Sequence, residues 1–449
     1  MKAPILIGLA AALWAPVTSA SAEAFAKSVT AASPVTTPVA SPAASLAGEE
    51  GGPGLALYAR KILTAEYGGR AVVNNGVLLV RDGKIESVGP ARSTTVPDGY
   101  ETVDLGDHWI APGMIDLHCH VAGTFDINDM VYLTNPGVRA STAVIPGNAA
   151  FDRAVAGGVT GVLFIPGSGT NMGGQGVLLR TGFEHYDESE IRNPGSLKLA
   201  QAGNPERWVI GPGRSFMNWN TRNTFNRGVA YAKRWGDYKK NGGPKPDRDP
   251  QLEIFRHLVE GTAQVSTHTQ IYQVVAMTIQ MVAKDLGLPV FIDHGTFDGW
   301  RAGGLAQEAG VPAILGPRSV DAPSPGIMRF AGSNPERFQG VAAGYQSMGH
   351  KKIGFNTDSP VVPQEELSVQ AAMGVRYGFD NSEMDAVRGL TIVPAMAADI
   401  DDQTGSIEAG KAADLLVLTG DPVDPRTAIE KVYQRGIKVY DTEEDVRRW

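Results

Sequence analysis

Residues 115–123 read IDLHCHVAG, and this stretch decides how the rest of the chain is interpreted. It places His118 and His120 on either side of Cys119, the single cysteine of the chain. An apolar run leads into the stretch and a glycine-containing loop follows it, as at the end of a β-strand. Residues two apart on a strand share a face, so both imidazoles are expected to point one way and the thiol the other. On its own, the pair fits two hydrogen-bonded structural histidines as well as a metal-binding pair.

Around this stretch, apolar strand-like runs alternate with helical segments over residues 114–399. The clearest runs are GVTGVLFIPGS, LGLPVFIDHGT, GVPAILGPRS and HKKIGFNTDSP, with helical pieces such as IYQVVAMTIQMVAKDLG between them. Several such units in series predict an α/β fold, a (β/α)₈ TIM-like barrel. Alternating apolar and polar residues in 55–113 and 400–449 predict a small β-sandwich domain built from both ends of the chain.

The N-terminus has the layout of a secretory signal peptide. Residues 1–22 combine Lys2, the apolar run ILIGLAAALW and the small residues SASA. Residues 23–54 are rich in Ala, Ser and Pro and are expected to form a flexible tether. The predicted location is therefore periplasmic or secreted, with no stable membrane span after removal of the leader.

The charge and the cysteine content argue against a protein that binds nucleic acid or anionic lipid through its overall charge, and against a fold held by internal disulfides. The net charge of -8 provides no general attraction to nucleic acid or anionic lipid. A single cysteine cannot form an internal disulfide, so stability must come from packing, with a bound metal as an optional addition. A homo-oligomer is compatible with the sequence.

Four more side chains follow the apolar runs where barrel strands are expected to end. They are Lys198 in GSLKLAQAGNP, His268 in AQVSTHTQ, His294 in VFIDHGT and Asp358 in IGFNTDSP. Their spacing corresponds to strands 1, 4, 5, 6 and 8 when the first histidine pair is counted as strand 1. The carboxyl ends of barrel strands meet at one face, so these side chains are expected to converge.

These motifs resemble the amidohydrolase superfamily. The resemblance rests on HCH at 118–120, HT at 268–269, IDHGT at 292–296, NTDSP at 356–360 and the closing SIEAGKAADLLVLTGDP, and it covers nearly all of residues 55–441. The most similar subgroup is the imidazolonepropionase-like set, which includes Xaa-Pro dipeptidase-type hydrolases.

The resemblance implies a divalent metal, zinc by preference, as one or two ions. His118 and His120 would bind the first ion. His268 and His294 would bind a second, or His268 alone would join a one-ion site. Asp358 would ligate metal and act as general base, and Lys198 would be a carboxylated bridging ligand. The sequence departs from the subgroup at Gly203, where similar segments carry glutamate in ALGENP.

Three residues are candidates for substrate binding. Gln175 lies in GTNMGGQGVLLR, residues 169–180, which is expected to be a loop at the barrel mouth and lacks the pattern of a phosphate-binding loop. Arg214 and Tyr231, like Arg222, lie in the basic and aromatic segment 206–248 and would hold a substrate carboxylate. The alternative for this segment is a solvated helix whose aromatic face packs on the barrel. Export argues against a third reading, single-stranded nucleic acid binding.

The sequence therefore predicts a metal-dependent hydrolase of C–N bonds in amides, dipeptides or cyclic amides. A metal-dependent deaminase of a ring substrate is the enzymatic alternative. The non-enzymatic alternative is an exported binding protein that keeps the fold. Cys119, directed away from the histidines, is expected to be a buried apolar residue.

Overall fold

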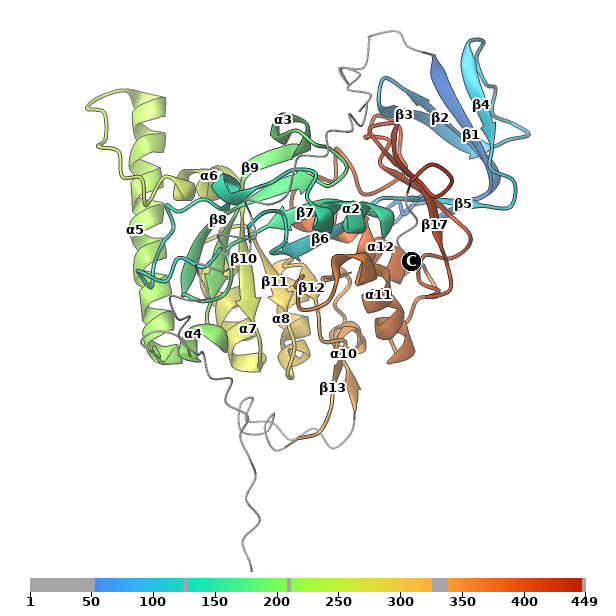
Figure 1. The fold of residues 1–449 in the computed structure, drawn as a ribbon. Coiled ribbons are helices and arrows are strands. Elements are labelled where there is room, and N and C mark those ends of the chain that lie inside the picture. Colours follow the sequence, from blue (N-terminus) through green and yellow to red (C-terminus); the bar gives the residue numbers. More distant parts are fainter. Residues whose placement is uncertain (1–52, 125–126, 208–210, 325–337, 446–449) are drawn as a thin grey trace, which may run out of the picture. The chain divides into compact units, whose positions relative to one another are not determined.

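The computed structural model of the chain describes residues 53–124, 127–207, 211–324 and 338–445. The predicted signal peptide and residues 23–52 of the predicted tether lie outside this part. Within the described ranges, no helix is both long enough and apolar enough to cross a membrane. Eight-stranded sheets make up the two main β structures, and Figure 1 shows their arrangement.

The larger structure is a nearly closed barrel sheet. Its eight strands are, in spatial order, β6 (Met114–Cys119), β7 (Val159–Phe164), β8 (Met172–Arg180), β9 (Glu190–Ala200), β10 (Gln264–Thr269), β11 (Val290–His294), β12 (Ala313–Leu315) and β15 (Ile353–Phe355). A parallel bridge between Cys119 and Ser359 brings the end of β6 beside the segment after β15. The mixed α/β class and the eight-stranded barrel are thereby confirmed.

The regular (β/α)₈ pattern is wrong at one strand. β8 runs antiparallel to both β7 and β9, and the other neighbours pair in parallel. The connection between β7 and β8, residues 165–171, is shorter than the dozen or more residues that a parallel crossover needs. The segment 169–180, expected to be a loop, is therefore mostly strand from Met172 onward.

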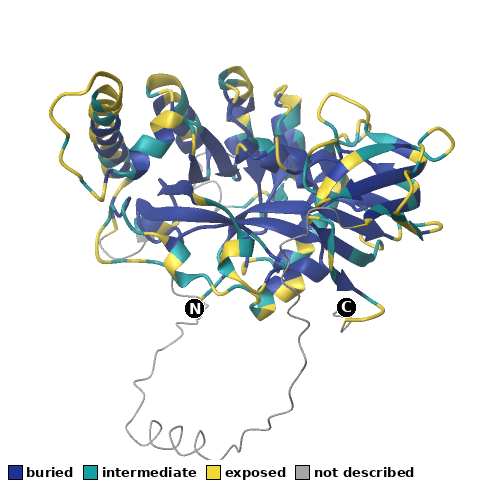
Figure 2. Ribbon diagram, turned by 90° about the horizontal axis from the view of Figure 1, so that it is seen from above, coloured by how far each residue is buried: buried dark blue, intermediate teal, exposed yellow. Residues whose placement is uncertain are grey.

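Helices cover the outside of the barrel sheet. They are α2 (Ala149–Ala156), α5 (Arg214–Asn241), α6 (Ile254–Glu260), α7 (Tyr272–Thr278) with its π-helical continuation η2 (Ile279–Asp285), η3 (Gly299–Ala302), α8 (Gly303–Ala309), α10 (Val341–Ser347), α11 (Leu367–Arg376), α12 (Asp385–Leu390) and α13 (Ile392–Ala397). Shorter elements are η1 (Ala140–Ala143), α3 (Tyr186–Ser189), α4 (Asn204–Arg207), η4 (Gln364–Glu366) and the two-stranded pair β13 (Val320–Asp321) and β14 (Gln339–Gly340). Figure 2 shows the buried strands at the centre and the exposed residues on the outer helix faces.

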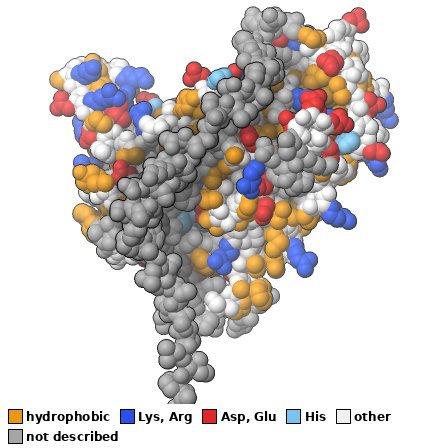
Figure 3. Space-filling model, viewed as in Figure 1, with side chains coloured by type: hydrophobic (Ala, Val, Ile, Leu, Met, Phe, Trp, Pro, Cys, Tyr) orange, Lys and Arg blue, Asp and Glu red, His pale blue; other side chains and the backbone are white. Residues whose placement is uncertain are grey.

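The long helix α5 accounts for the basic and aromatic segment. Its buried face includes Phe225 and Tyr231, and the Phe225 ring packs edge-on against Phe255 of α6 at 5.2 Å between centroids. A Cβ at Gly228 would lie 2.2 Å from the Phe255 ring, so only glycine allows the two helices to approach this closely. This arrangement supports the packed-helix reading of the segment over a nucleic-acid surface. On the face of the molecule that Figure 3 shows, basic and acidic side chains are interspersed.

Both ends of the described chain contribute to the second sheet. Its strands are β1 (Gly54–Leu63), β2 (Val72–Arg81), β3 (Lys84–Pro90), β4 (Tyr100–Asp104), β5 (Trp109–Pro112), β16 (Leu415–Leu418), β17 (Ile429–Gln434) and β18 (Ile437–Asp441). The two halves join where β5 pairs antiparallel with β16. All eight strands belong to one hydrogen-bonded sheet, so a separate β-sandwich is not confirmed, and the domain boundaries stay a prediction.

Candidate metal centre

His118 of β6 and His120 directly after it point into the barrel, and the cysteine between them does not. The Nε2 atoms of His118 and His120 lie 3.1 Å apart. Cys119 is fully buried on the other side of the strand, with its Sγ 3.5 Å from Gln364 Oε1. Burial raises the pKa of the Cys119 thiol to about 12, which removes its thiolate at neutral pH. The expected direction of all three side chains is confirmed.

Asp358 completes a tight group with this pair. Its Oδ1 lies 3.1 Å from His118 Nε2 and 3.3 Å from His120 Nε2. The backbone N–H of His120 donates to Ser359 O at 2.9 Å, which fixes the end of β6 against the segment that carries Asp358. Burial favours a neutral carboxyl, but the neighbouring His118 outweighs it and holds the pKa of Asp358 far below its usual range. Asp358 is therefore a carboxylate at all physiological pH values.

His268 and His294 extend the group along β10 and β11. The ring centroids of His268 and His294 are 4.3 Å apart, and those of His118 and His294 are 4.5 Å apart. The Nε2 atoms of His268 and His294 are buried and have no hydrogen-bond partner in the described part of the chain. Burial lowers the pKa of His294 to about 4 and that of His268 well below its usual value, so both imidazoles are neutral.

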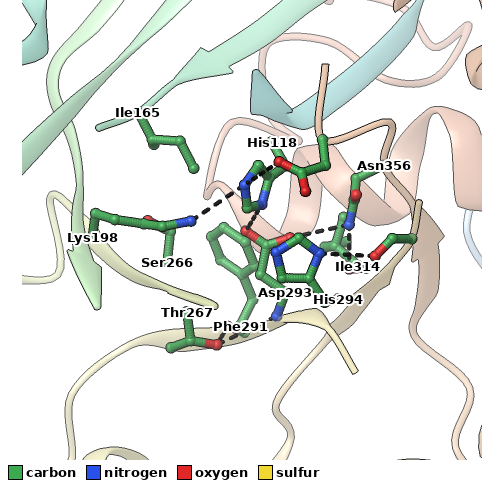
Figure 4. Close-up of polar contacts among 12 residues, drawn as sticks. His118, Ile165, Lys198, Ser266, Thr267, Phe291, Asp293, His294, Ile314 and Asn356 are labelled. Carbon is green, nitrogen blue, oxygen red and sulfur yellow. Dashed lines mark hydrogen bonds and ion pairs between the residues drawn. The ribbon is translucent and has the colours of Figure 1, made fainter. Parts of the chain in front are cut away.

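Lys198 reaches the same group from β9. Its Nζ lies 3.3 Å from His118 Nε2, and its side chain is fully buried. Burial lowers the pKa of Lys198 to about 8, against the opposing effect of Asp293 and Asp358. Figure 4 shows the Lys198 amine and the His118 ring pointing toward one another, with Asp293 and His294 on the other side of the His118 ring.

The donor pattern of the imidazoles fits a divalent cation. The Nδ1–H of His118 donates to Asp293 Oδ2 at 2.6 Å, that of His120 to Ile165 O at 2.9 Å, and that of His294 to Gly316 O at 2.8 Å. Each of these bonds directs an Nε2 lone pair into the group. Lone pairs and a carboxylate oxygen crowded within 3.3 Å of one another repel unless a positive charge lies among them. Burial opposes a charged His118, but Asp293 and then Asp358 outweigh this effect and raise the pKa of His118 to about 9. The raised pKa shows that this position favours a positive charge, as a metal site does.

Two sets of side chains have the spacing of metal ligands. One is His118, His120 and Asp358, and the other is His118, Asp293 and His294. We favour the first set, because the carboxylate of Asp293 already accepts the Nδ1–H of His118 and so lies behind that ring.

His294 and Asp358 also share an unusual backbone conformation. Their φ angles are +70° and +49°, in the left-handed region that residues with a Cβ seldom adopt. Such conformations cost on the order of 1–3 kcal/mol each and concentrate at functional sites. The fold therefore holds two of the candidate ligands in place at the expense of local backbone strain.

Outer residues that the sequence reasoning missed hold the candidate ligands. Asp293 Oδ1 accepts a hydrogen bond from Asn356 Nδ2 at 3.0 Å. Burial alone would raise the pKa of Asp293, but the neighbouring His118 outweighs burial and lowers it. Asp116 Oδ1 accepts from His118 N at 3.1 Å, and its Oδ2 accepts from Thr357 Oγ1 at 2.5 Å. The strand period was the available signal, since Asp116 lies on the same face of β6 as His118. Asp293 stood inside the quoted IDHGT motif, but nothing in the sequence indicated its partner.

The three predicted substrate-binding residues have other contacts. Gln175 is buried on β8 and its Nε2 donates to Pro136 O at 2.9 Å. Tyr231 is buried in α5 and its hydroxyl donates to Glu253, which gives it a packing role. Arg214 pairs with Glu206, with 2.7 Å between its Nε and Glu206 Oε1. The structure therefore favours none of the three as a direct substrate contact. Glu206, the partner of Arg214, also accepts from Gly203 N.

Comparison with known proteins shows similarity to amidohydrolases. The model of the family described as "Amidohydrolase family" matches residues 309–439. An amidohydrolase structure from Thermotoga maritima MSB8 superimposes with a TM-score of 0.74 at 27% identity, covering 86% of this chain and 100% of that one. A Xaa-Pro dipeptidase structure covers the same shares of the two chains with a TM-score of 0.53 at 17% identity, which shows a shared fold.

Curated relatives match over different lengths. The amidohydrolase tasK of Hapsidospora irregularis is 23% identical over 414 residues, and the match spans 83% of this chain but 40% of tasK. An imidazolonepropionase of a Methylobacterium strain is 43% identical over 53 residues, 13% of its length. The imidazolonepropionase of Pseudomonas putida is 24% identical over 399 residues, 79% of this chain and 90% of that enzyme. Residues 309–439 therefore match the amidohydrolase family model, and the described chain is similar in fold to an amidohydrolase structure along most of its length.

Proposed function

We propose that this protein is a metal-dependent hydrolase of C–N bonds in small amides, dipeptides or cyclic amides. The observation that carries the proposal is the inward-facing donor group. His118, His120 and Asp358 crowd three donor atoms within 3.3 Å, and His268 and His294 add buried Nε2 atoms that no described group satisfies. Buried imidazoles without a partner are costly in a purely structural cluster, and a metal ion would satisfy all of them.

The chain's own residues then have distinct parts in hydrolysis. A bound divalent ion would lower the pKa of a coordinated water from 15.7 to about 7 and polarise the substrate carbonyl. Asp358, held as a carboxylate beside the histidines, would accept the proton of the attacking water and return it to the leaving nitrogen. Asp293 would keep the His118 ring in the tautomer that presents Nε2.

The proposed cofactor is zinc, as one or two ions. Imidazole and carboxylate oxygen are ordinary ligands of this ion. A second ion would need Lys198 as a carboxylated bridge, and its buried position beside His118 Nε2 supports that role. A neutral amine with a lowered pKa is also the form that reacts with carbon dioxide.

The proposed location and partners follow from the sequence. The signal-like residues 1–22 support export, so we propose a periplasmic or secreted protein that meets small-molecule substrates. The ring deaminase reading shares the same donor group and predicts ammonia as a product. The binding-protein reading predicts ligand affinity without turnover.

The test is a substrate screen with the zinc-loaded protein. Dipeptides, N-acyl amino acids and cyclic amides are assayed beside ring amines, with release of amine or ammonia as the readout. We expect hydrolysis of at least one amide class, abolished by a chelator and restored by zinc. Turnover of ring amines alone would establish the deaminase, and no turnover with any of these compounds would refute the proposal.

A further inference from the structure

Gln270 is a polar side chain beside the candidate site, and no group in the described part of the chain bonds to it. It follows directly after β10, two residues beyond His268, and is half-buried. Among the described residues its carboxamide takes part in no hydrogen bond, unlike Gln175 and Gln364, whose amides are bonded to the protein. A carboxamide carries both donors and an acceptor, and a half-buried one with no partner is available to a ligand.

The space in front of Gln270 is shaped by Gly203. A Cβ at Gly203 would lie 3.3 Å from Gln270 Oε1 and 3.6 Å from His268 Nε2, and among the described residues outside this turn no other atom lies within 4 Å. A ligand group in van der Waals contact with Gly203 Cα on this side would therefore lie near both His268 Nε2 and Gln270 Oε1. We call this space, bounded by Gly203, His268 and Gln270, the Gly203 notch.

The backbone that forms the notch is fixed. The N–H of Gly203 donates to Glu206 Oε2 at 2.9 Å, and Arg214 Nε holds the other oxygen of that carboxylate at 2.7 Å. The φ angle of Gly203 is +77°, which favours glycine and keeps side chains out. Because Gly203 has no side chain, the space beside Gln270 Oε1 is open to a ligand group.

We propose that Gln270 is a specificity residue and that the Gly203 notch receives an N–H group of the substrate, which donates to Gln270 Oε1. This inference rests on the proposed function and narrows its substrate class to amides that carry an N–H. A substrate carbonyl bound beside His268 has its amide nitrogen one bond away, within reach of the notch. An N-methyl amide would place a methyl group against Gln270 Oε1 and leave that oxygen without a donor.

The test compares a matched pair of substrates, an amide and its N-methyl derivative. For each zinc-loaded protein, the preference is the kcat/KM for the N–H amide divided by that for its N-methyl derivative. We expect this ratio to be about tenfold larger in wild type than in Gln270→Leu, with the difference arising in KM. Leucine keeps the size of the side chain and removes its polar atoms. Gln403→Leu is the control, because Gln403 is an exposed glutamine in the segment after α13.

Binding provides a readout that does not depend on turnover. A non-hydrolysable phosphonamidate pair, with and without the N–H, is titrated calorimetrically into each protein. The ratio of the two Kd values should fall about tenfold in Gln270→Leu and stay unchanged in Gln403→Leu. Gly203→Ala, which places a methyl group in the notch, should raise KM for both substrates.

The outcomes separate this inference from the proposed function. If the wild-type protein hydrolyses amides but Gln270→Leu shows the same N–H preference as wild type in kinetics and in Kd, the role of Gln270 is refuted and the hydrolase remains. If no amide is hydrolysed but the Kd ratio falls in Gln270→Leu, the notch is supported in a protein that is not an amide hydrolase.

Discussion

The carboxylate of Asp293 is the most direct test of the candidate metal centre, because it acts without being a ligand in the set that we favour. Its two oxygens accept separately, Oδ2 from His118 Nδ1 at 2.6 Å and Oδ1 from Asn356 Nδ2 at 3.0 Å. Asparagine at this position offers one acceptor and one donor. In either orientation of the amide, one of the two buried donors would face an N–H₂ group, so the variant Asp293→Asn cannot satisfy both.

The expected magnitude follows from that mismatch. An unsatisfied buried donor costs about 1–3 kcal/mol. Loss of the carboxylate behind a ligating histidine typically weakens metal binding by about 10–100-fold, roughly 1.4–2.7 kcal/mol. We therefore expect the Kd for zinc of Asp293→Asn to rise by that factor, with the His118 ring less firmly held in the tautomer that presents Nε2.

The assay is competition for zinc with a chromophoric chelator, at fixed pH and with circular dichroism as the check on folding. Asp187→Asn is the matched control, since Asp187 is exposed on α3. A folded Asp293→Asn protein that holds zinc as tightly as wild type would refute the outer-carboxylate role. It would then have to be explained how His118 keeps its orientation without that partner.

Four further outcomes are expected. Asp358→Asn should lower kcat by at least about 10²-fold while the circular dichroism spectrum stays that of wild type; retained turnover would remove Asp358 as the base. Chelation should lower Tm and zinc should restore it, by about 4 kcal/mol of stability at a free zinc concentration 1,000 times Kd; an unchanged Tm would contradict metal binding to the folded state. In the metal-free protein, His294 binds a proton near pH 6.5 in the unfolded chain but only at about pH 4 in the folded protein. The free energy of unfolding should therefore fall as the pH decreases through this window. The fall should be about 3 kcal/mol larger in wild type than in His294→Gln. Lys198→Met should bind a single zinc ion and show no response to bicarbonate; two bound ions in this variant, measured by elemental analysis, would contradict the bridging role.

The sequence predicted the barrel because its strands are buried on both faces and end in recognisable loops. β7, β11, β12 and β15 all lie within the apolar runs that indicated them, and α7 and η2 lie in the helical piece IYQVVAMTIQMVAKDLG. β8 was missed because the glycines of MGGQG indicated a loop, and its apolar residues alone would not have separated a parallel from an antiparallel strand. Only the short link of residues 165–171 distinguishes them, and that length was not used.

The same limit applies to the candidate site. Side chains at strand ends could be predicted to converge, since the barrel geometry alone brings them to one face. Their outer partners could not, because the bond from His118 to Asp293 joins residues 175 positions apart and depends on ring orientation. Arg214 and Tyr231 were misjudged for the opposite reason. Their chemistry suited a substrate carboxylate, but nearby acids, Glu206 and Glu253, already satisfy them.

Charge balance connects Lys198 to the number of ions. Asp293 and Asp358 are the carboxylates that contact the imidazole nitrogens of the group, and one divalent cation balances these two charges if the lysine is neutral. An ammonium 3.3 Å from a ligating His118 Nε2 would add an unbalanced positive charge in a fully buried position. A bound cation must therefore push Lys198 further toward the free amine than burial alone, which already lowers its pKa to about 8. That amine either stays neutral beside one ion or becomes a carbamate, whose negative charge balances part of the charge of a second ion. The ammonium form is incompatible with both states, so metal binding should release a proton from Lys198 whenever the apoprotein carries one there.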